Sequence, residues 1–140
     1  MKVIEPYVFF EGRCEEALAF YEKAIGAKVE AKLRYSDGPK EACPQGLPAG
    51  TENKIMHALF KVGDSKVMAS DGMNSGKPEF KGVTLSLALD DAAAVKKAFD
   101  ALSAGGKVVQ PLTETFFSPS FGMLNDKFGV SWMVLVYKEM

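Results

Sequence analysis

Residues 4–26, IEPYVFFEGRCEEALAFYEKAIG, switch from one hydrophobic period to another within a short stretch. Residues 4–10 are mostly β-branched or aromatic, which is typical of a strand, and Gly12 breaks that run. From Cys14 to Ile25 the apolar residues recur every three or four positions, as on one face of an amphipathic helix. Gly26 follows, and glycine tolerates the left-handed backbone that often ends a helix. The stretch predicts a strand followed by a helix.

The remainder of the first half predicts three more strands and one long loop. Residues 27–35 again form a strand-like run, whereas residues 36–53 contain three prolines and three glycines, which no regular element accommodates. Two further strands are predicted over 54–62 and 65–70, because the Gly-Asp pair between them suits a tight hairpin turn. The first half therefore predicts the order βαβββ.

The second half predicts the same order. Residues 83–89, VTLSLAL, alternate large aliphatic and small side chains, as in a strand with one face packed on a helix. Asp90 or Asp91 can cap the next helix, which we expect to stop at the glycine pair beginning with Gly105. Three more strands are predicted, over residues 107–113, 121–125 and 130–137.

The two halves align when the chain is shifted against itself by 79 residues. Six pairs then coincide: Phe10 with Leu89, Glu11 with Asp90, Phe20 with Phe99, Gly26 with Gly105, Lys28 with Lys107 and Val29 with Val108. Six matches in one register indicate a duplicated unit. The alternative is a single α+β sandwich in which the matches are coincidental.

Composition restricts the class of protein. The chain has 140 residues, of which 47% are hydrophobic, and its 17 basic and 18 acidic residues contain no long run of like charge. We therefore expect no nucleic-acid partner. No apolar run approaches the length of a membrane span, and the first residues do not read as a signal peptide, so we expect a cytoplasmic protein with no membrane partner. Cys14 and Cys43 lack CxxC spacing and are expected to stay reduced.

The repeated unit, with Phe20-Tyr21 on the first helix, resembles the vicinal-oxygen-chelate superfamily, which includes glyoxalases, extradiol dioxygenases and bleomycin-binding proteins. Four segments resemble its PhnB-like branch: YVFFEGRCEEALAFY at 7–21, HALF at 57–60, VMASDG at 67–72 and DKFGVSW at 126–132. The resemblance implies an α+β fold of two βαβββ modules, about 3–72 and about 82–138, that form a curved mixed sheet in a single glyoxalase-like domain over 1–140. It also implies a homodimer.

Members of the same branch are also described as demethylubiquinone methyltransferases. A methyl transferase needs a site for its sulfonium donor, which is usually a glycine-rich strand-to-helix turn followed by an acidic residue. We find no such turn in this sequence, which therefore does not predict methyl transfer.

In metal-dependent members of the superfamily, ligands on the first, fourth, fifth and eighth strands hold a divalent ion that polarises substrate oxygens. Projecting this pattern places the fifth-strand position at Thr84 and the eighth-strand position at Met133. A neutral hydroxyl is a weak ligand and a thioether is a soft one, so neither suits a hard or borderline cation. We expect no bound metal and no other cofactor.

Three titratable residues keep a catalytic alternative open. Glu5 stands at the first-strand ligand position, unless Pro6 does, and Asp71 lies just beyond the fourth-strand position, where we expect it to make a turn by bonding its own backbone. His57 is the single histidine and is either a hydrogen-bonded structural residue or an acid–base group. In the alternating pattern Ile55 and Leu59 share its face, but sequence does not tell which face that is. An atypical metal site would need Glu5, His57 and Asp71 together.

The remaining candidates predict a binding site that is mostly apolar with a few polar groups, as small-molecule pockets tend to be. They are Tyr7, Phe9, Thr84, Ser86, Met133 and Tyr137, together with Phe117 and Phe121. The last two belong to segment 116–121, which begins with Phe116 and which we expect to join two strands. The aromatic residues of that segment can border the site, contact a partner subunit or fill the core. Trp132 is expected to pack under a helix, and loop 36–53 either covers the site or simply connects strands.

These observations lead to three hypotheses. The first is a small-molecule binder of PhnB-like type without a metal, and it is favoured by Thr84 and Met133 at the ligand positions. The alternative is a metal-dependent lyase, isomerase or dioxygenase of the glyoxalase kind with an atypical ligand set. The third is metal-free proton transfer by His57 or Glu5, with Tyr7 or Ser86 orienting the substrate. The strands show no basic cluster, so the sequence does not support a phosphonate ligand.

Overall fold

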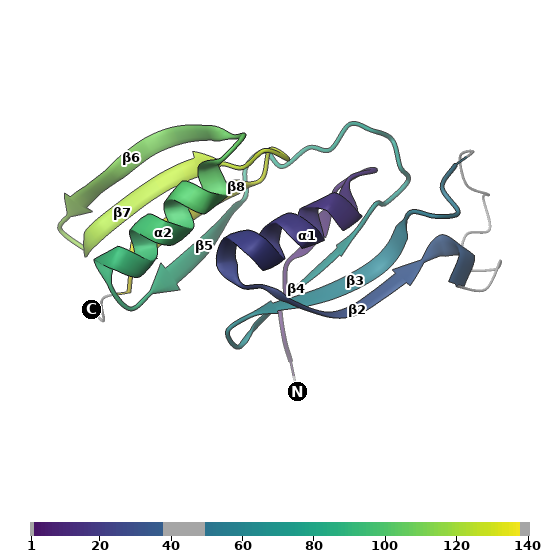
Figure 1. Cartoon of the computed structure of the whole chain (residues 1–140), viewed down its shortest axis with the longest axis horizontal. Coiled ribbons are helices and arrows are strands. Elements are labelled where there is room, and N and C mark those ends of the chain that lie inside the picture. Colours follow the sequence, from purple (N-terminus) through teal and green to yellow (C-terminus); the bar gives the residue numbers. More distant parts are fainter. Residues whose placement is uncertain (1, 38–49, 138–140) are drawn as a thin grey trace. The chain divides into compact units, whose positions relative to one another are not determined.

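The computed structural model describes residues 2–37 and 50–137. The chain divides into two compact units, Met1–Pro78 and Glu79–Met140, and the described residues of each form a four-stranded sheet and an α-helix (Figure 1). Most of the predicted loop 36–53 lies outside the described residues. No helix in the described part of the chain is long and apolar enough to cross a membrane.

The first unit has the strand order β1–β4–β3–β2, in which only the β1–β4 pair is parallel. Helix α1 lies across one face of this sheet (Figure 1). The elements are β1 (Tyr7–Phe9), α1 (Cys14–Ile25), β2 (Lys28–Arg34), the 3₁₀ helix η1 (Tyr35–Asp37), β3 (Ile55–Val62) and β4 (Ser65–Ser70).

Helix α1 forms as its hydrophobic period predicts. Gly26 ends it in the left-handed conformation, with φ of 68°, and its N–H donates to the carbonyl of Tyr21. The buried face of α1 packs on the sheet through the Tyr21 ring, whose centroid lies 6.1 Å from that of Phe10 and 5.7 Å from that of Phe60. The Phe60 face of the sheet is therefore the helix-covered face.

The second unit repeats the arrangement, with the strand order β5–β8–β7–β6 and only β5–β8 parallel. Its elements are β5 (Thr84–Leu89), α2 (Ala92–Ser103), β6 (Lys107–Thr115), β7 (Ser118–Asn125) and β8 (Ser131–Val136). Asp91 caps α2, because its side chain accepts a hydrogen bond of 2.8 Å from the Ala94 N–H. Trp132 is buried on the α2 side of the sheet, as predicted.

The predicted α+β fold of two βαβββ modules is confirmed, with differences at the strand ends. Strand β1 covers only Tyr7–Phe9, because it is an edge strand that pairs with β4 alone, and Ile4 is fully exposed. Strands β6 and β7 extend toward each other until only residues 116 and 117 connect them. The prediction that the whole segment 116–121 is a connection is therefore wrong.

Candidate functional site

The exposed face of the first sheet carries His57, and a β-bulge puts it there. In the β2–β3 pair, Leu33 lies opposite His57 and Arg34 opposite Ile55, so Met56 has no partner residue. Ile55 is consequently fully buried, whereas His57 is only partly buried. The prediction that Ile55 and His57 share a sheet face is wrong, because the bulge inserts one additional residue between them and so reverses the alternation.

Tyr7 and Phe9 lie on the same exposed face and form a cluster with His57. The Tyr7 and Phe9 rings stack with their centroids 4.8 Å apart, and the Tyr7 hydroxyl lies 3.3 Å from Nδ1 of His57. Tyr7 is 38% exposed and Phe9 is 49% exposed, although both are large apolar side chains. We call these three residues the aromatic face. It offers flat apolar surface beside one hydrogen-bonded polar pair.

The structure does not bring the three suspected metal ligands together. Glu5 lies two residues before β1 and is partly buried. His57 contacts Tyr7, while Asp71 is buried elsewhere in the unit. Among residues 2–37 and 50–137, no group of three or more His, Cys, Asp or Glu side chains is placed to hold a metal ion.

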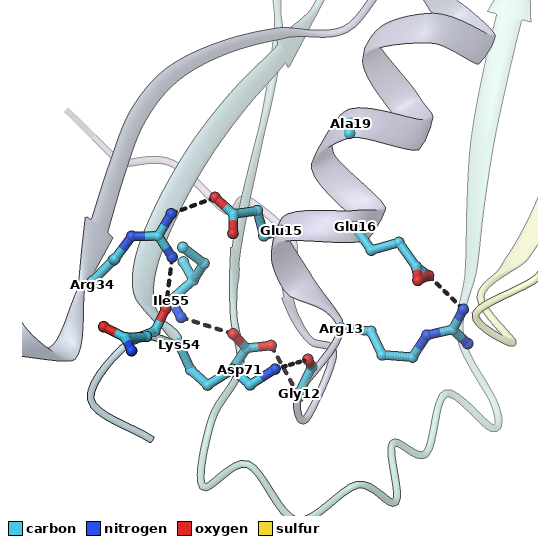
Figure 2. A pocket seen from close by; sticks show the side chains of 10 residues that line it. Gly12, Arg13, Glu15, Glu16, Ala19, Arg34, Lys54, Ile55 and Asp71 are labelled. Atoms are coloured by element: carbon cyan, nitrogen blue, oxygen red, sulfur yellow. Dashed lines mark hydrogen bonds and ion pairs between the residues drawn. The ribbon is translucent and has the colours of Figure 1, made fainter. Parts of the chain in front are cut away.

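Asp71 has a different role from the one predicted. It is 1% exposed, and its carboxylate accepts backbone N–H bonds from Gly12 at 2.9 Å, Cys14 at 2.7 Å and Ile55 at 2.7 Å. The expectation that this side chain bonds its own turn is wrong. The carboxylate instead joins the first turn of α1 to the start of β3 and satisfies N–H groups that would otherwise be unpaired (Figure 2).

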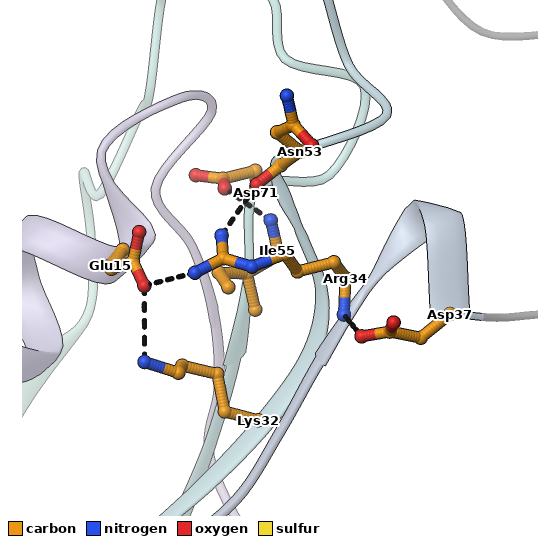
Figure 3. A network of polar contacts seen from close by, with 7 residues as sticks. All are labelled: Glu15, Lys32, Arg34, Asp37, Asn53, Ile55 and Asp71. Carbon is orange, nitrogen blue, oxygen red and sulfur yellow. Dashed lines mark hydrogen bonds and ion pairs between the residues drawn. The ribbon is translucent and has the colours of Figure 1, made fainter.

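A hollow of about 580 Å³ lies at the N-terminal end of α1 and is lined by basic and acidic residues that bind one another (Figure 2). Glu15 accepts from Arg34 at 2.5 Å and from Lys32 at 3.0 Å (Figure 3). The Arg34 guanidinium, followed by the Lys32 ammonium, lowers the pKa of Glu15. Arg34 also donates to the carbonyl of Asn53 at 2.6 Å. These groups connect α1, β2 and the residues before β3, so their arrangement stabilises the fold.

Cys14 lies at the start of α1 and is fully buried. Burial, together with the nearby Asp71 carboxylate, raises the pKa of its thiol to about 12. The thiol is therefore protonated at neutral pH and a poor nucleophile. Cys43 lies outside the described residues.

The exposed face of the second sheet carries the predicted residues Thr84, Ser86 and Met133. Strand pairing arranges this face in three rows, which are Thr84–Ser131–Asn125, Ser86–Met133–Met123 and Ala88–Leu135–Phe121. The opposite face belongs to α2, since a Cβ added at Gly122 would lie 2.6 Å from the Phe99 ring. Sequence reasoning missed Ser131, Asn125 and Met123, which only the strand register could have revealed.

The other predicted aromatic residues lie at one end of the second unit. The rings of Phe117 and Phe121 meet edge to face at 5.1 Å, and Phe116, at the turn between β6 and β7, is 92% exposed. Phe116 therefore does not fill the core, which was one of the three roles considered for these aromatic residues. Tyr137 follows β8 and is 67% exposed. The predicted residues lie in two separate units, so a single binding site that combines them stays a prediction.

Two βαβββ units, each with a helix on one sheet face and candidate residues on the other, define a glyoxalase-like α+β protein. A solved glyoxylase/bleomycin resistance protein/dioxygenase domain from Frankia shares this fold, with a TM-score of 0.63 at 13% identity over 99% of this chain and 97% of that one. Residues 2–135 match the family model described as 3-demethylubiquinone-9 3-methyltransferase. The chain belongs to this PhnB-like family.

Individual relatives agree with this assignment over nearly their whole length. The chain is 37% identical to Protein YjdN of Escherichia coli, covering 97% of this chain and 96% of the relative. It resembles the crystal structure of protein PA1353 from Pseudomonas aeruginosa, with a TM-score of 0.85, 40% identity and coverage of 99% and 100%. A PhnB protein from Bacillus cereus, described as a putative 3-demethylubiquinone-9 3-methyltransferase, gives a TM-score of 0.77 at 27% identity, with coverage of 96% and 99%.

Proposed function

We propose that this protein binds a small organic molecule without a metal ion, and that the aromatic face is one of its contact surfaces. The observation that carries the proposal is the exposure of Tyr7 and Phe9 beside His57. Stacked rings left accessible to solvent are a feature of recognition surfaces, because covering them removes apolar area from water. The Tyr7–His57 pair adds hydrogen-bonding groups that can orient a ligand.

A flat ligand fits this surface better than a compact one. A planar ring lying on Tyr7 or Phe9 gains roughly 0.5–1.5 kcal/mol per ring pair beyond the burial of its area. His57 can donate or accept a hydrogen bond at the border of the same surface. These contributions favour an aromatic or conjugated molecule that has one polar substituent.

Methyl transfer, which the family's description names, is not part of this proposal. A sulfonium donor of nucleotide type is usually held by a glycine-rich turn and the helix that follows it. Here the turn between β1 and α1 contains one glycine, Gly12, and the N–H groups of Gly12 and Cys14 are bound by Asp71. The start of α1 is therefore occupied by a carboxylate of the protein itself.

Proton transfer is a second candidate function, favoured by the 3.3 Å contact between the Tyr7 hydroxyl and His57 Nδ1. An imidazole ring can remove or deliver a proton, and the tyrosine hydroxyl can fix its orientation. Glu5 precedes β1 on the same alternation as Tyr7 and is the further acid–base candidate. A reaction of this kind would take place on the aromatic face and would need no metal.

Titration with indole, a neutral flat aromatic probe, tests the aromatic face. We expect indole to shift the amide NMR signals of β1 and the ring signals of His57, and Tyr7→Ala to weaken binding by roughly 1 kcal/mol. Phe116→Ala is the matched control, because it also removes an exposed aromatic ring but leaves the first unit unchanged. Equal binding by wild type and Tyr7→Ala would refute the use of this surface.

Native mass spectrometry of protein purified without chelator or affinity-tag metal tests the rest of the proposal. It reports the subunit count, bound ions and co-purified molecules in one measurement. We expect a homodimer that carries either an organic adduct or none. A stoichiometric Ni, Zn, Mn or Fe ion would refute metal-free binding and support the alternative, a metal-dependent lyase, isomerase or dioxygenase.

A further inference from the structure

A second hollow, of about 410 Å³, lies at the end of the second sheet where β5 and β8 begin and β7 ends. Four of its lining residues have polar side chains, namely Lys81, Thr84, Asn125 and Ser131. We call these four residues the hydroxyl pocket. Three of them form the first of the cross-strand rows on the exposed sheet face.

The hydroxyl pocket is rich in hydrogen-bond donors. Thr84 Oγ1 and Ser131 Oγ lie 2.8 Å apart, and whichever hydroxyl donates, the hydrogen of the other is left to point at a ligand. The Asn125 amide adds two N–H groups and Lys81 adds an ammonium. In the described part of the chain, no acidic side chain lines this hollow or pairs with Lys81. The pocket therefore complements an anionic oxygen group.

The next two rows of the same face change from polar to apolar. Beyond the hydroxyl pocket lie the paired residues Met133 and Met123, and beyond these lie Leu135 and Phe121. Methionine side chains adapt to irregular apolar ligands, and Leu135 and Phe121 extend the apolar area. The distance along β8 from the first row to the third is four residues, or about 13 Å. A ligand that matches this face has one polar end and an elongated apolar body.

We propose that the hydroxyl pocket binds the carboxylate of an amphipathic organic acid whose apolar body lies along Met133, Met123 and Phe121. The carboxylate accepts hydrogen bonds from Lys81 and from the Thr84–Ser131 pair. The inference rests on the proposed function in one respect, because it assumes that a small molecule occupies an exposed sheet face. It goes further by naming the chemical class and its orientation.

Decanoate, compared with the neutral decanol, tests the pocket in the full chain. Protein labelled at the methionine methyl groups is titrated with each compound, and we expect decanoate to bind more tightly and to shift the Met133 and Met123 signals. Lys81→Gln and Thr84→Val should each weaken decanoate binding about fivefold, the typical effect of losing one charged or hydrogen-bonded contact at a partly exposed site. Lys97→Gln, on the exposed side of α2, is the charge-matched control and should change nothing.

The outcomes separate this inference from the proposed function. Equal binding of decanoate and decanol, or unchanged decanoate affinity in both pocket variants, overturns the carboxylate site. In that case indole binding to the aromatic face can still support the broader function. Lys81-dependent decanoate binding without indole binding supports the carboxylate site and overturns the aromatic face. Far-UV circular dichroism of each variant establishes that a loss of binding is not a loss of fold.

Discussion

Replacing Asp71 by asparagine measures how much one buried carboxylate contributes to the first unit. One carboxylate oxygen accepts from the N–H groups of Gly12 and Cys14, and the other accepts from Ile55. An asparagine keeps one of these oxygens and replaces the other by an NH₂ group, which would point a donor at a backbone donor. At least one buried N–H then loses its acceptor, which costs about 1–3 kcal/mol, and the remaining bonds lose their charge assistance. We expect Asp71→Asn to lower the free energy of unfolding by roughly 2–4 kcal/mol.

Urea unfolding followed by far-UV circular dichroism is the appropriate assay, because the signal reports α1 and the sheet together. Asp64→Asn is the matched control, since it makes the same chemical change in the exposed turn between β3 and β4. We expect Asp71→Ala to be at least as destabilising as Asp71→Asn, because it leaves all three N–H groups without an acceptor. If Asp71→Asn and Asp64→Asn differ by less than about 0.5 kcal/mol, the buried carboxylate does not stabilise the unit as argued.

Three further predictions follow from other contacts. Glu15 has a lowered pKa in the folded protein, so its contribution to stability is present above its ordinary pKa of 4.5 and is lost as the pH falls through its pKa in the folded state. The difference in urea midpoint between wild type and Glu15→Gln should therefore shrink below pH 4.5. A difference that stays constant with pH would contradict this. Cys14 has a pKa of about 12, so only roughly 10⁻⁴ of it should be thiolate at pH 8. In the Cys43→Ser variant, the native protein should therefore resist iodoacetamide, which modifies the urea-unfolded chain. Rapid labelling of the native protein would disprove burial of the thiol. Gly122→Ala places a Cβ 2.6 Å from the Phe99 ring and should lower the free energy of unfolding, measured by thermal unfolding, by about 1–3 kcal/mol. Adding Phe99→Leu should restore part of this loss. If it restores none, the clash lies elsewhere.

The fold could be predicted because its signals are local in sequence. Gly26 marks the end of α1 and Asp91 caps α2, and both act within a few residues of the position they define. The repeat was visible for a related reason. Strands β2 and β6 begin at residues 28 and 107, which preserves the 79-residue shift, whereas β3 and β7 begin at 55 and 118, only 63 apart. The sixteen additional residues fall in the loop of the first unit, so the register holds before it and fails after it.

The site could be predicted only in part, because its geometry depends on contacts between distant residues. The bulge at Met56 decides which face His57 occupies, and nothing in an alternating run of apolar residues shows where an extra residue will be inserted. Asp71 was misread for a similar reason. A local turn was the obvious partner for an aspartate before a glycine, while the N–H groups that it binds lie 16, 57 and 59 residues away.

Polar groups in the first unit divide between two sheet faces, and this division separates stability from binding. On the helix-covered side, Asp71 is buried and its oxygens are satisfied by backbone donors, so a change there is expected to act on unfolding. On the exposed side, Tyr7 and His57 contact each other at the surface, where a truncation leaves no fully buried polar group without a partner. Tyr7→Ala should therefore lower the urea midpoint much less than Asp71→Asn does, while reducing indole binding. Asp71→Asn should leave indole binding unchanged as long as the protein is folded. A loss of stability in Tyr7→Ala as large as that in Asp71→Asn would mean that the aromatic face is structural, and the proposed function would then lose the observation that carries it.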